Sequence, residues 1–382
     1  MGGFQSYYDE EAIDEPIEEL PTPCLVLDLD ILERNLRRMA LRMRKLKVRM
    51  RPHFKTHRNL QIAETQKELQ ARGFTVSTLL EAQALLEGGY RDITWAYPVV
   101  PSRISQLEPL LEQILLRLTV DSHEALDALE KGIQSVEPIH LFLKVDCGYH
   151  RAGVDPEGDL AIDLARRIDA SPRFVFDGIL SHSGQAYEGR GKEALRAIAE
   201  EERAVMVAAA ERLRQAGVEV PEVSIGSTPA MSAVENLEGI TEVRPGNYVF
   251  YDYSQCEIGS CGVEDCALTV VSTVVSSQPG ARHSVIDAGA LTLSKDPGPS
   301  WVDPPTFGRI YADYEDHRLD PDLRIVSLSQ EHGIVNAPLP VGTRVRVLPN
   351  HSCLVMPNFE TYHVVRGDRV VDYGPIALGV LD

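Results

Sequence analysis

The segment Val48-Arg49-Met50-Arg51-Pro52-His53-Phe54-Lys55-Thr56-His57 begins as a short strand-forming run and ends in a basic cluster. It is the first of eight β-rich runs that alternate with helical patterns up to about residue 247. In the helical stretches, apolar residues recur three and four positions apart, as in Glu193–Ala216. This repeated alternation predicts a parallel (β/α)8 barrel, with an open doubly wound sheet as the alternative. The predicted strands are Val48–Pro52, Phe74–Ser77, Ile93–Tyr97, Leu118–Asp121, His140–Asp146, Phe176–Leu180, Glu222–Ile225 and Glu242–Val243, and the predicted helices include Leu60–Ala71, Leu79–Glu87, Glu124–Ile133 and Glu193–Ala216.

The sequence changes character after about residue 251, where glycine and proline become frequent and long helical patterns stop. Short β-rich runs dominate this part, which predicts a separate β-domain. We therefore expect a barrel domain over residues 20–250 and a β-domain over residues 251–382. Residues 1–19 are expected to form an N-terminal extension that packs on the β-domain. Arg366-Gly367-Asp368-Arg369 predicts a hairpin turn between two of the β-rich runs.

Composition excludes several classes of protein. Of the 382 residues, 43% are hydrophobic and 25% are charged, as in ordinary globular proteins. The formal net charge is −19 and no basic stripe is present, which argues against nucleic-acid and anionic-membrane partners. No apolar run reaches the roughly 18 residues that a membrane span requires. The N-terminus lacks the zones of a signal peptide, so we expect a cytoplasmic protein.

The six cysteines contain no CxxC pair, and a disulfide framework is improbable in a chain of this length. Cys256, Cys261 and Cys266 recur every five residues, a spacing that suits no common zinc motif. We expect these three cysteines to be small, buried apolar side chains.

Lys55 follows the first predicted strand, and barrel active sites lie at the carboxyl ends of the strands. Neighbouring positive charge from His53 and His57, together with partial burial, would lower the pKa of this lysine and favour the free amine that attacks an aldehyde. A solvated lysine in a basic turn is the alternative interpretation.

Two small-residue turns follow the last predicted barrel strands. They are Gly226-Ser227-Thr228-Pro229 and Arg244-Pro245-Gly246-Asn247-Tyr248. Barrels of this kind build phosphate sites at these positions from backbone N–H groups and a short helix start. His182 lies at the end of another strand, where it is either a functional residue or a histidine satisfied by the backbone.

His351 and Cys353 follow a β-rich run in Asn350-His351-Ser352-Cys353. In an extended segment residues i and i+2 point the same way, so this imidazole and thiolate are candidates to bind one metal ion, of which zinc is the best match. A buried pair in a strand is the alternative.

Taken together, these motifs resemble the metal-dependent branch of the alanine-racemase-like, fold type III pyridoxal-phosphate enzymes. This branch contains D-threonine aldolases, D-serine dehydratases and 3-hydroxy-D-aspartate lyases. The resemblance runs from Leu20 to Asp372, nearly the whole chain. Its most specific stretches are Arg51–His57, Ser224–Pro229, Glu242–Tyr248, Gln330–Gly333 and Pro349–Cys353.

The resemblance implies roles for individual residues. Lys55 would hold pyridoxal 5'-phosphate as a Schiff base, and His182 would be a base or a substrate contact. Either Tyr187 or Arg244 would lie near the pyridine nitrogen. His351 and Cys353 would bind a divalent metal, with zinc favoured and manganese as the other option. The remaining cofactor contacts would come from His53, Gly226, Ser227, Thr228, Gly246, Asn247 and Tyr248.

The resemblance also implies a reaction. The cofactor accepts electrons from a bond broken at Cα, and a metal acting as a Lewis acid on a β-hydroxyl predicts a 3-hydroxy-D-amino acid as substrate. Retro-aldol cleavage to glycine and an aldehyde, as in D-threonine aldolase, is the first expectation. Dehydration to a 2-oxo acid and ammonia, as in D-serine dehydratase, is nearly as well supported. An amino-acid racemase and a non-catalytic cofactor-binding protein are less favoured, and a homodimer is expected.

Overall fold

The computed structural model describes residue 13 and residues 15–377. The chain divides into two compact units. The barrel unit comprises residues 38–55 and 63–246, and the β-unit comprises residues 1–37, 56–62 and 247–382. The boundaries fall within helix α1 (Leu29–Lys45), after Lys55, within helix α2 (Leu60–Glu68) and after Gly246.

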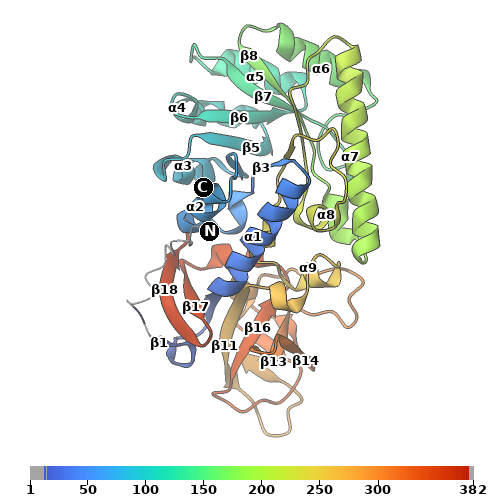
Figure 1. Cartoon of the computed structure of the whole chain (residues 1–382). Coiled ribbons are helices and arrows are strands. Elements are labelled where there is room, and N and C mark those ends of the chain that lie inside the picture. The colour runs from blue at the N-terminus through green and yellow to red at the C-terminus, as the bar shows by residue number, and fades with distance from the viewer. Residues whose placement is uncertain (1–12, 14, 378–382) are drawn as a thin grey trace. The chain divides into compact units, whose positions relative to one another are not determined.

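Eight parallel strands form the sheet of the barrel unit, in the order β3-β10-β9-β8-β7-β6-β5-β4 (Figure 1). A further parallel bridge between His53 and Thr75 joins the two end strands. The predicted barrel and its eight strands are thereby confirmed. The strands are β3 (Arg49–Met50), β4 (Phe74–Val76), β5 (Asp92–Pro98), β6 (Leu115–Val120), β7 (Ile139–Lys144), β8 (Phe174–Leu180), β9 (Glu222–Ile225) and β10 (Glu242–Val243). Besides α2, the helices are α3 (Leu79–Glu87), α4 (Glu108–Leu111), α5 (His123–Gly132), α6 (Asp159–Ala170), α7 (Lys192–Gln215) and α8 (Thr228–Ala233).

The start of β6 differs from the prediction, and the added residues include a buried charged side chain. β6 begins at Leu115, three residues before its predicted start, and includes Arg117. Arg117 is buried and pairs with Asp92 and with Asp177, whose Oδ2 lies 2.7 Å from its Nε. A charged residue therefore fits within this strand because both of its partners belong to the same sheet.

Arg51 is another buried cation of the barrel, with 1% of its side chain exposed. Its Nε donates to Glu242 Oε2 at 2.8 Å, and its Nη1 donates to Asp92 Oδ1 at 2.6 Å. Gly73 makes room for the guanidinium, because a Cβ there would lie 2.5 Å from Arg51 Nη1. These contacts connect Arg51, which directly follows β3, with one residue of β5 and one residue of β10.

The β-unit contains a ten-stranded sheet in the order β1-β18-β17-β2-β11-β12-β15-β14-β13-β16. An additional pairing of β16 with β11 closes the last six strands into a small antiparallel barrel. Helices are short here, as predicted: α9 (Tyr253–Glu257), α10 (Ala290–Leu293) and α11 (Ser352–Val355). The strands are β1 (Glu15–Pro16), β2 (Cys24–Asp28), β11 (Leu268–Ser276), β12 (Ser284–Ile286), β13 (Gly308–Asp313), β14 (Arg318–Leu328), β15 (Gly333–Val335), β16 (Arg344–Pro349), β17 (Thr361–Arg366) and β18 (Arg369–Pro375).

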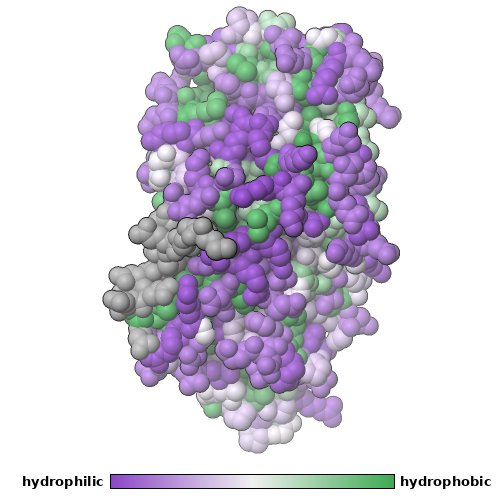
Figure 2. Space-filling model, viewed as in Figure 1, coloured by the Kyte–Doolittle hydropathy of each residue, from purple (hydrophilic) through white to green (hydrophobic). Residues whose placement is uncertain are grey.

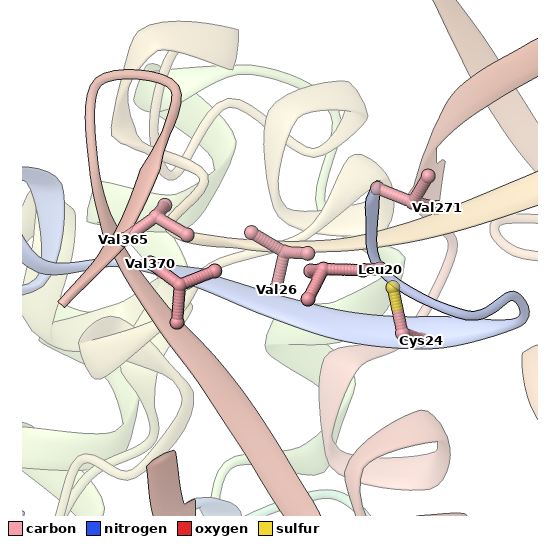
Figure 3. Close-up of a cluster of buried hydrophobic side chains, with 6 residues drawn as sticks. All are labelled: Leu20, Cys24, Val26, Val271, Val365 and Val370. Carbon is pink, nitrogen blue, oxygen red and sulfur yellow. The ribbon is translucent and has the colours of Figure 1, made fainter. Parts of the chain in front are cut away.

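The N-terminal segment supplies part of the core of the β-unit. β2 pairs in parallel with β17 and antiparallel with β11. A cluster of buried apolar side chains joins these strands, and Ile13 and Ile17 pack against it (Figure 3). The compact units therefore place residues 20–37 with the β-rich part of the chain, although the predicted limits put them in the barrel domain. Of the predicted extension over residues 1–19, residues 1–12 and 14 lie outside the described part. The cluster consists of Leu20, Cys24, Val26, Val271, Val365 and Val370.

Hydrophilic residues cover most of the face shown in Figure 2, with small groups of apolar residues between them. Over residue 13 and residues 15–377, no helix has both the length and the apolar character needed to cross a membrane.

Replacing Arg51 with methionine should lower the free energy of unfolding by about 3–5 kcal/mol, because the buried Glu242 carboxylate loses its partner. Burial opposes ionisation of Glu242, but Arg51 holds its pKa below the ordinary value. The stabilisation is therefore present above the ordinary carboxyl pKa and is lost as the pH falls. Urea unfolding of each variant at neutral and acidic pH measures both effects.

Arg49→Met is the matched control. Arg49 lies two residues earlier, also pairs with a glutamate (Glu222), and has 45% of its side chain exposed. Its loss should cost about 0–1 kcal/mol. Equal losses for the two variants would contradict the importance of the buried pair.

Candidate active site

Polar side chains gather where β7 and β8 end, at the edge of the barrel where active sites of this fold lie. A pocket with about 200 Å³ of empty volume opens there. Lys144, the last residue of β7, and His182, two residues after β8, both line it. Of the lining residues only His182 is predicted from the sequence. The others are Val145, Asp146, Cys147, Tyr149, Arg151 and Ala152.

The electrostatic environment of this pocket is strongly positive. Burial lowers the pKa of His182 well below its ordinary value, and the charges of Arg151, Lys55, Lys144 and Arg244 lower it further. Burial, together with Arg244 and Arg151, lowers the pKa of Lys144 to about 8. The excess of positive charge suits an anionic ligand such as a phosphate or a carboxylate. The neutral imidazole of His182 is available to accept a proton.

Two tyrosines flank the His182 ring. The Tyr149 ring lies edge-on with its centroid 6.3 Å away, and the Tyr187 ring lies 6.5 Å away. Gly184 permits this arrangement, because a Cβ there would lie 2.2 Å from the Tyr149 ring. The structure thus brings the predicted residues His182 and Tyr187 together.

Lys55 is exposed and lies in the short 3-10 helix Phe54–Thr56 that follows β3. The expectation of a partly buried lysine is therefore wrong, because Lys55 lies beyond the end of β3, on the exposed side of a 3-10 helix whose other residues, Phe54 and Thr56, are buried. Its charge, after burial, lowers the pKa of His53 well below the ordinary value. The Nδ1 atom of His53 is buried and has no hydrogen-bond partner within the described part of the chain. His57 belongs to the β-unit segment, where its Nδ1 accepts the Asn59 N–H at 3.2 Å.

Arg244 is buried and holds the ends of neighbouring strands. Its guanidinium donates to Ser224 Oγ and to the Ser181 carbonyl oxygen. Burial lowers the pKa of Arg244 to about 10, and the nearby carboxylates of Glu242 and Glu202 oppose that shift. Arg244 therefore stays protonated at neutral pH and contributes a fixed positive charge.

Gly226, Ser227, Thr228 and Gly246, which are predicted to contact the phosphate, lie together in the barrel unit. Gly226 has a φ of +107°, and a Cβ there would lie 3.2 Å from Met231. The side chain of Ser227 caps α8. The Gly246 N–H donates to Thr228 Oγ1 at 3.2 Å, which joins the two turns. Small residues, hydroxyl groups and nearby positive charge fit a phosphate-bearing ligand, and the exposed amine of Lys55 fits an aldehyde.

Glu202 supports this region and was not predicted. Its buried Oε1 accepts the Ser181 hydroxyl at 2.8 Å and the Gly226 N–H at 3.2 Å. The sequence does contain a signal for it, because Glu202 falls on the buried face of α7 with Ala199 and Met206. A carboxylate at an apolar position of an amphipathic helix indicates a buried partner.

Asn247 and Tyr248 begin the last segment of the β-unit. The Asn247 amide donates to Asp252 Oδ2 at 2.7 Å and to Ser352 Oγ at 3.0 Å. It also lies 3.5 Å from Cys353 Sγ. Tyr248 is fully buried in the core. The structure therefore places Asn247 beside the predicted metal ligands of its own unit.

His351 and Cys353 lie close together, but not in a strand as expected. β16 ends at Pro349, His351 occupies the N-cap position of α11 without a side-chain capping bond, and Cys353 lies within that helix. His351 Nδ1 is 2.8 Å from Asp296 Oδ2. Burial opposes protonation of His351, but hydrogen bonds with Asp296 and Cys353 raise its pKa well above the ordinary value.

This donor set fits a divalent metal. Metal-binding histidines usually donate their second ring N–H to a carboxylate, which orients the ring, and Asp296 provides that carboxylate. The thiol of Cys353 favours zinc over magnesium or calcium. Asp296 lies more than fifty residues from His351 in the chain, so the motif spacing gave no indication of it.

Comparisons with known proteins agree with this arrangement. Residues 27–254 match the family model described as alanine racemase, N-terminal domain, and residues 267–365 match a serine dehydratase domain model. The chain is 38% identical to D-threo-3-hydroxyaspartate dehydratase of Delftia sp. (strain HT23), over 92% of this chain and 96% of that one. It is 34% identical to D-serine dehydratase of Dictyostelium discoideum, over 94% and 96%. It is 28% identical to D-threonine aldolase of Arthrobacter sp, over 94% and 92%.

The solved structure of the Delftia dehydratase superimposes with a TM-score of 0.89 at 36% identity, and covers 96% of this chain and 100% of that chain. A cysteine-to-alanine mutant of that dehydratase was solved in a metal-free form, with the same TM-score.

Replacing Gly226 with alanine should weaken binding of pyridoxal phosphate about tenfold or more, equivalent to about 1.4 kcal/mol. The added methyl group would lie 3.2 Å from Met231 Cγ, which is tighter than ordinary contact, so the Met231 side chain must shift beside the cradle. Titration of the metal-loaded apoprotein with pyridoxal phosphate, followed by absorbance, measures the change.

Gly217→Ala is the control, because Gly217 also has a positive φ (+88°) but nothing lies within 4 Å of its added Cβ. Both variants should lose about 1–2 kcal/mol of stability from backbone strain. If both bind the cofactor like the wild type, Gly226 does not shape the cradle.

Proposed function

Because the chain belongs to the alanine-racemase-like family of pyridoxal-phosphate enzymes and is a lyase of that family, we propose that it eliminates water from 3-hydroxy-D-amino acids. The products would be a 2-oxo acid and ammonia. D-Serine, D-threonine and D-threo-3-hydroxyaspartate are the substrates of choice, since all three carry a hydroxyl group on Cβ. Zinc is the proposed metal and a homodimer is the proposed assembly.

The arrangement around His351 carries this proposal. The Asp296 carboxylate lies 2.8 Å from Nδ1 of the ring, so Nε2 is the atom left for a metal, and Cys353 lies beside the ring. An imidazole and a thiolate leave positions open at a tetrahedral zinc ion, as a catalytic site requires. A racemase has no need of such a pair, because racemisation moves only the Cα proton.

The identities favour dehydration over cleavage. Two relatives that are more than 30% identical over more than 90% of this chain are dehydratases, whereas the D-threonine aldolase is 28% identical. This reverses the order expected from the sequence, where the aldolase reaction came first. Retro-aldol cleavage is the second candidate, because the aldolase also matches over most of its length.

The residues of the barrel unit have separable tasks in this proposal. When bound, pyridoxal phosphate supplies an electron sink for the bond broken at Cα and the divalent metal supplies a Lewis acid. Lys55 attaches the cofactor and exchanges the proton at Cα. The cradle at Gly226–Thr228 binds the phosphate. Lys144 and Arg151 attract anionic carboxylates. His182, which burial and its cationic neighbours keep neutral, would contact the substrate near the β-hydroxyl, and only in the alternative retro-aldol cleavage would it accept the proton of that hydroxyl.

Product analysis tests the choice of reaction. Metal-loaded protein incubated with D-threonine should yield equal amounts of 2-oxobutanoate and ammonia, and L-threonine should yield neither. Glycine and acetaldehyde as the main products would establish the aldolase instead. Epimers of threonine alone would establish a racemase. Undiminished activity after exhaustive chelation would disprove the role of His351 and Cys353.

Lys55→Ala should abolish covalent attachment of the cofactor. Borohydride reduction should add one reduced cofactor to the mass of the wild-type chain and none to the variant, because no amine remains to form the bond. Lyase activity should be lost with it. Lys131→Ala, at a helical lysine with 79% of its side chain exposed, should behave like the wild type. Labelling of the Lys55 variant at wild-type level would place the attachment elsewhere.

Asp296→Asn should reduce the affinity for zinc by about 10–100-fold, because the His351 ring loses the carboxylate that orients it. Competition with a chromophoric chelator measures the affinity. Asp316→Asn, at an exposed aspartate of the same unit, should leave it unchanged. Equal affinities for both variants would show that Asp296 does not support the metal.

A further inference from the structure

Three cysteines that the proposed reaction does not use lie together in the β-unit. Cys256 is in α9, Cys261 is in the following loop, and Cys266 lies two residues before β11 begins. Cys256 Sγ lies 3.6 Å from Cys261 Sγ and 3.4 Å from Cys266 Sγ. Within the described residues, this is the only group of three or more histidine, cysteine or acidic side chains whose ligand atoms all lie within 4.8 Å of one another.

The sulfur–sulfur distances are those of ligands around a metal ion. With zinc–sulfur bonds of about 2.3 Å in a tetrahedral arrangement, neighbouring sulfurs are about 3.8 Å apart. A disulfide requires about 2.05 Å and uses two cysteines, which would leave the third thiol without a function. The expectation that all three are buried apolar side chains is also incomplete, because Cys256 and Cys261 are half-buried and only Cys266 is buried.

A buried phenol provides a second, independent observation. Tyr311 of β13 has 8% of its surface exposed, and its hydroxyl has no hydrogen-bond partner within the described part of the chain. Burial raises the pKa of Tyr311, and Cys266 and Cys256 are among the charges that raise it further, so these thiols lie near the phenol. Within the described residues this O–H reaches no acceptor, sulfur included, so an unsatisfied buried polar group lies near the cluster. Such a group often marks the place of a water molecule or an ion.

Repulsion between neighbouring thiolates also favours the binding of a cation by the cluster. Its three sulfur atoms all lie within 4.8 Å of one another. Three thiolates so close together repel one another and are stable only with a compensating positive charge. A thiophilic divalent ion supplies that charge and deprotonates the coordinating thiols.

We propose that Cys256, Cys261 and Cys266 form a second metal site that binds one thiophilic ion, preferably zinc, and fastens the segment between α9 and β11. The site is distinct from His351 and Cys353. Its three thiolates leave the fourth position to a water molecule, since no fourth histidine, cysteine or acidic ligand belongs to the group within the described residues.

Metal content in a background without the first site tests the proposal. The double variant His351→Ala/Cys353→Ala, expressed with zinc and purified under reducing conditions, should retain one zinc per chain. Adding Cys261→Ser should remove it, whereas adding Cys24→Ala, which deletes a buried thiol outside the cluster, should not. Cys261 is half-buried, so its replacement by serine should be tolerated.

A second measurement needs no variant. Reduced, metal-stripped wild-type protein titrated with Co²⁺ should develop thiolate-to-cobalt absorption. In a separate experiment, zinc should protect three cysteines in addition to Cys353 from a thiol reagent. Absence of zinc from the double variant, together with free reaction of these cysteines, would overturn the proposal. A mass lower by two hydrogens, with no bound metal, would also overturn it and would identify a disulfide instead.

Discussion

A buried guanidinium, Arg244, is the interaction on which the catalytic edge of the barrel depends. Its backbone N–H pairs with Ile225, while its side chain binds the Ser224 hydroxyl and the Ser181 carbonyl. One residue thereby connects the ends of β8, β9 and β10. Because a buried cation is stable only beside negative charge, the two carboxylates Glu242 and Glu202 are part of the same requirement.

Each of these two carboxylates also binds a second group in the barrel unit. Glu242 also binds Arg51, which in turn pairs with Asp92 near the start of β5. Glu202 reaches from α7 to the N–H of Gly226, the glycine of the predicted cradle. The charges that stabilise the barrel and those that create a positive pocket therefore belong to one network. This explains how an acidic chain with a net charge of −19 offers a site for anions.

The sequence predicted the barrel well because local patterns are sufficient for it. Strand–helix alternation has a short period, so each unit of the barrel is visible within a few dozen residues. The N-terminal strand β2 was not predicted as part of the β-unit because its partners β11 and β17 are distant in the sequence. The same limit applies to the site. His182 and the residues of the predicted cradle follow strands, so the sequence could single them out as candidates. Asp296, Tyr311 and the gathering of Cys256, Cys261 and Cys266 depend on tertiary structure.

The pairing of β2 has a consequence for the order in which the protein is made. The last barrel strand ends at Val243, so all barrel strands are synthesised well before the end of the chain and the barrel sheet can form early. Cys24–Asp28, in contrast, has no partner strand until Leu268–Ser276 emerges, and it gains its second neighbour only with Thr361–Arg366. During translation this apolar strand remains an unpaired edge for most of the elongation time, and such an edge is a target for chaperones and for aggregation.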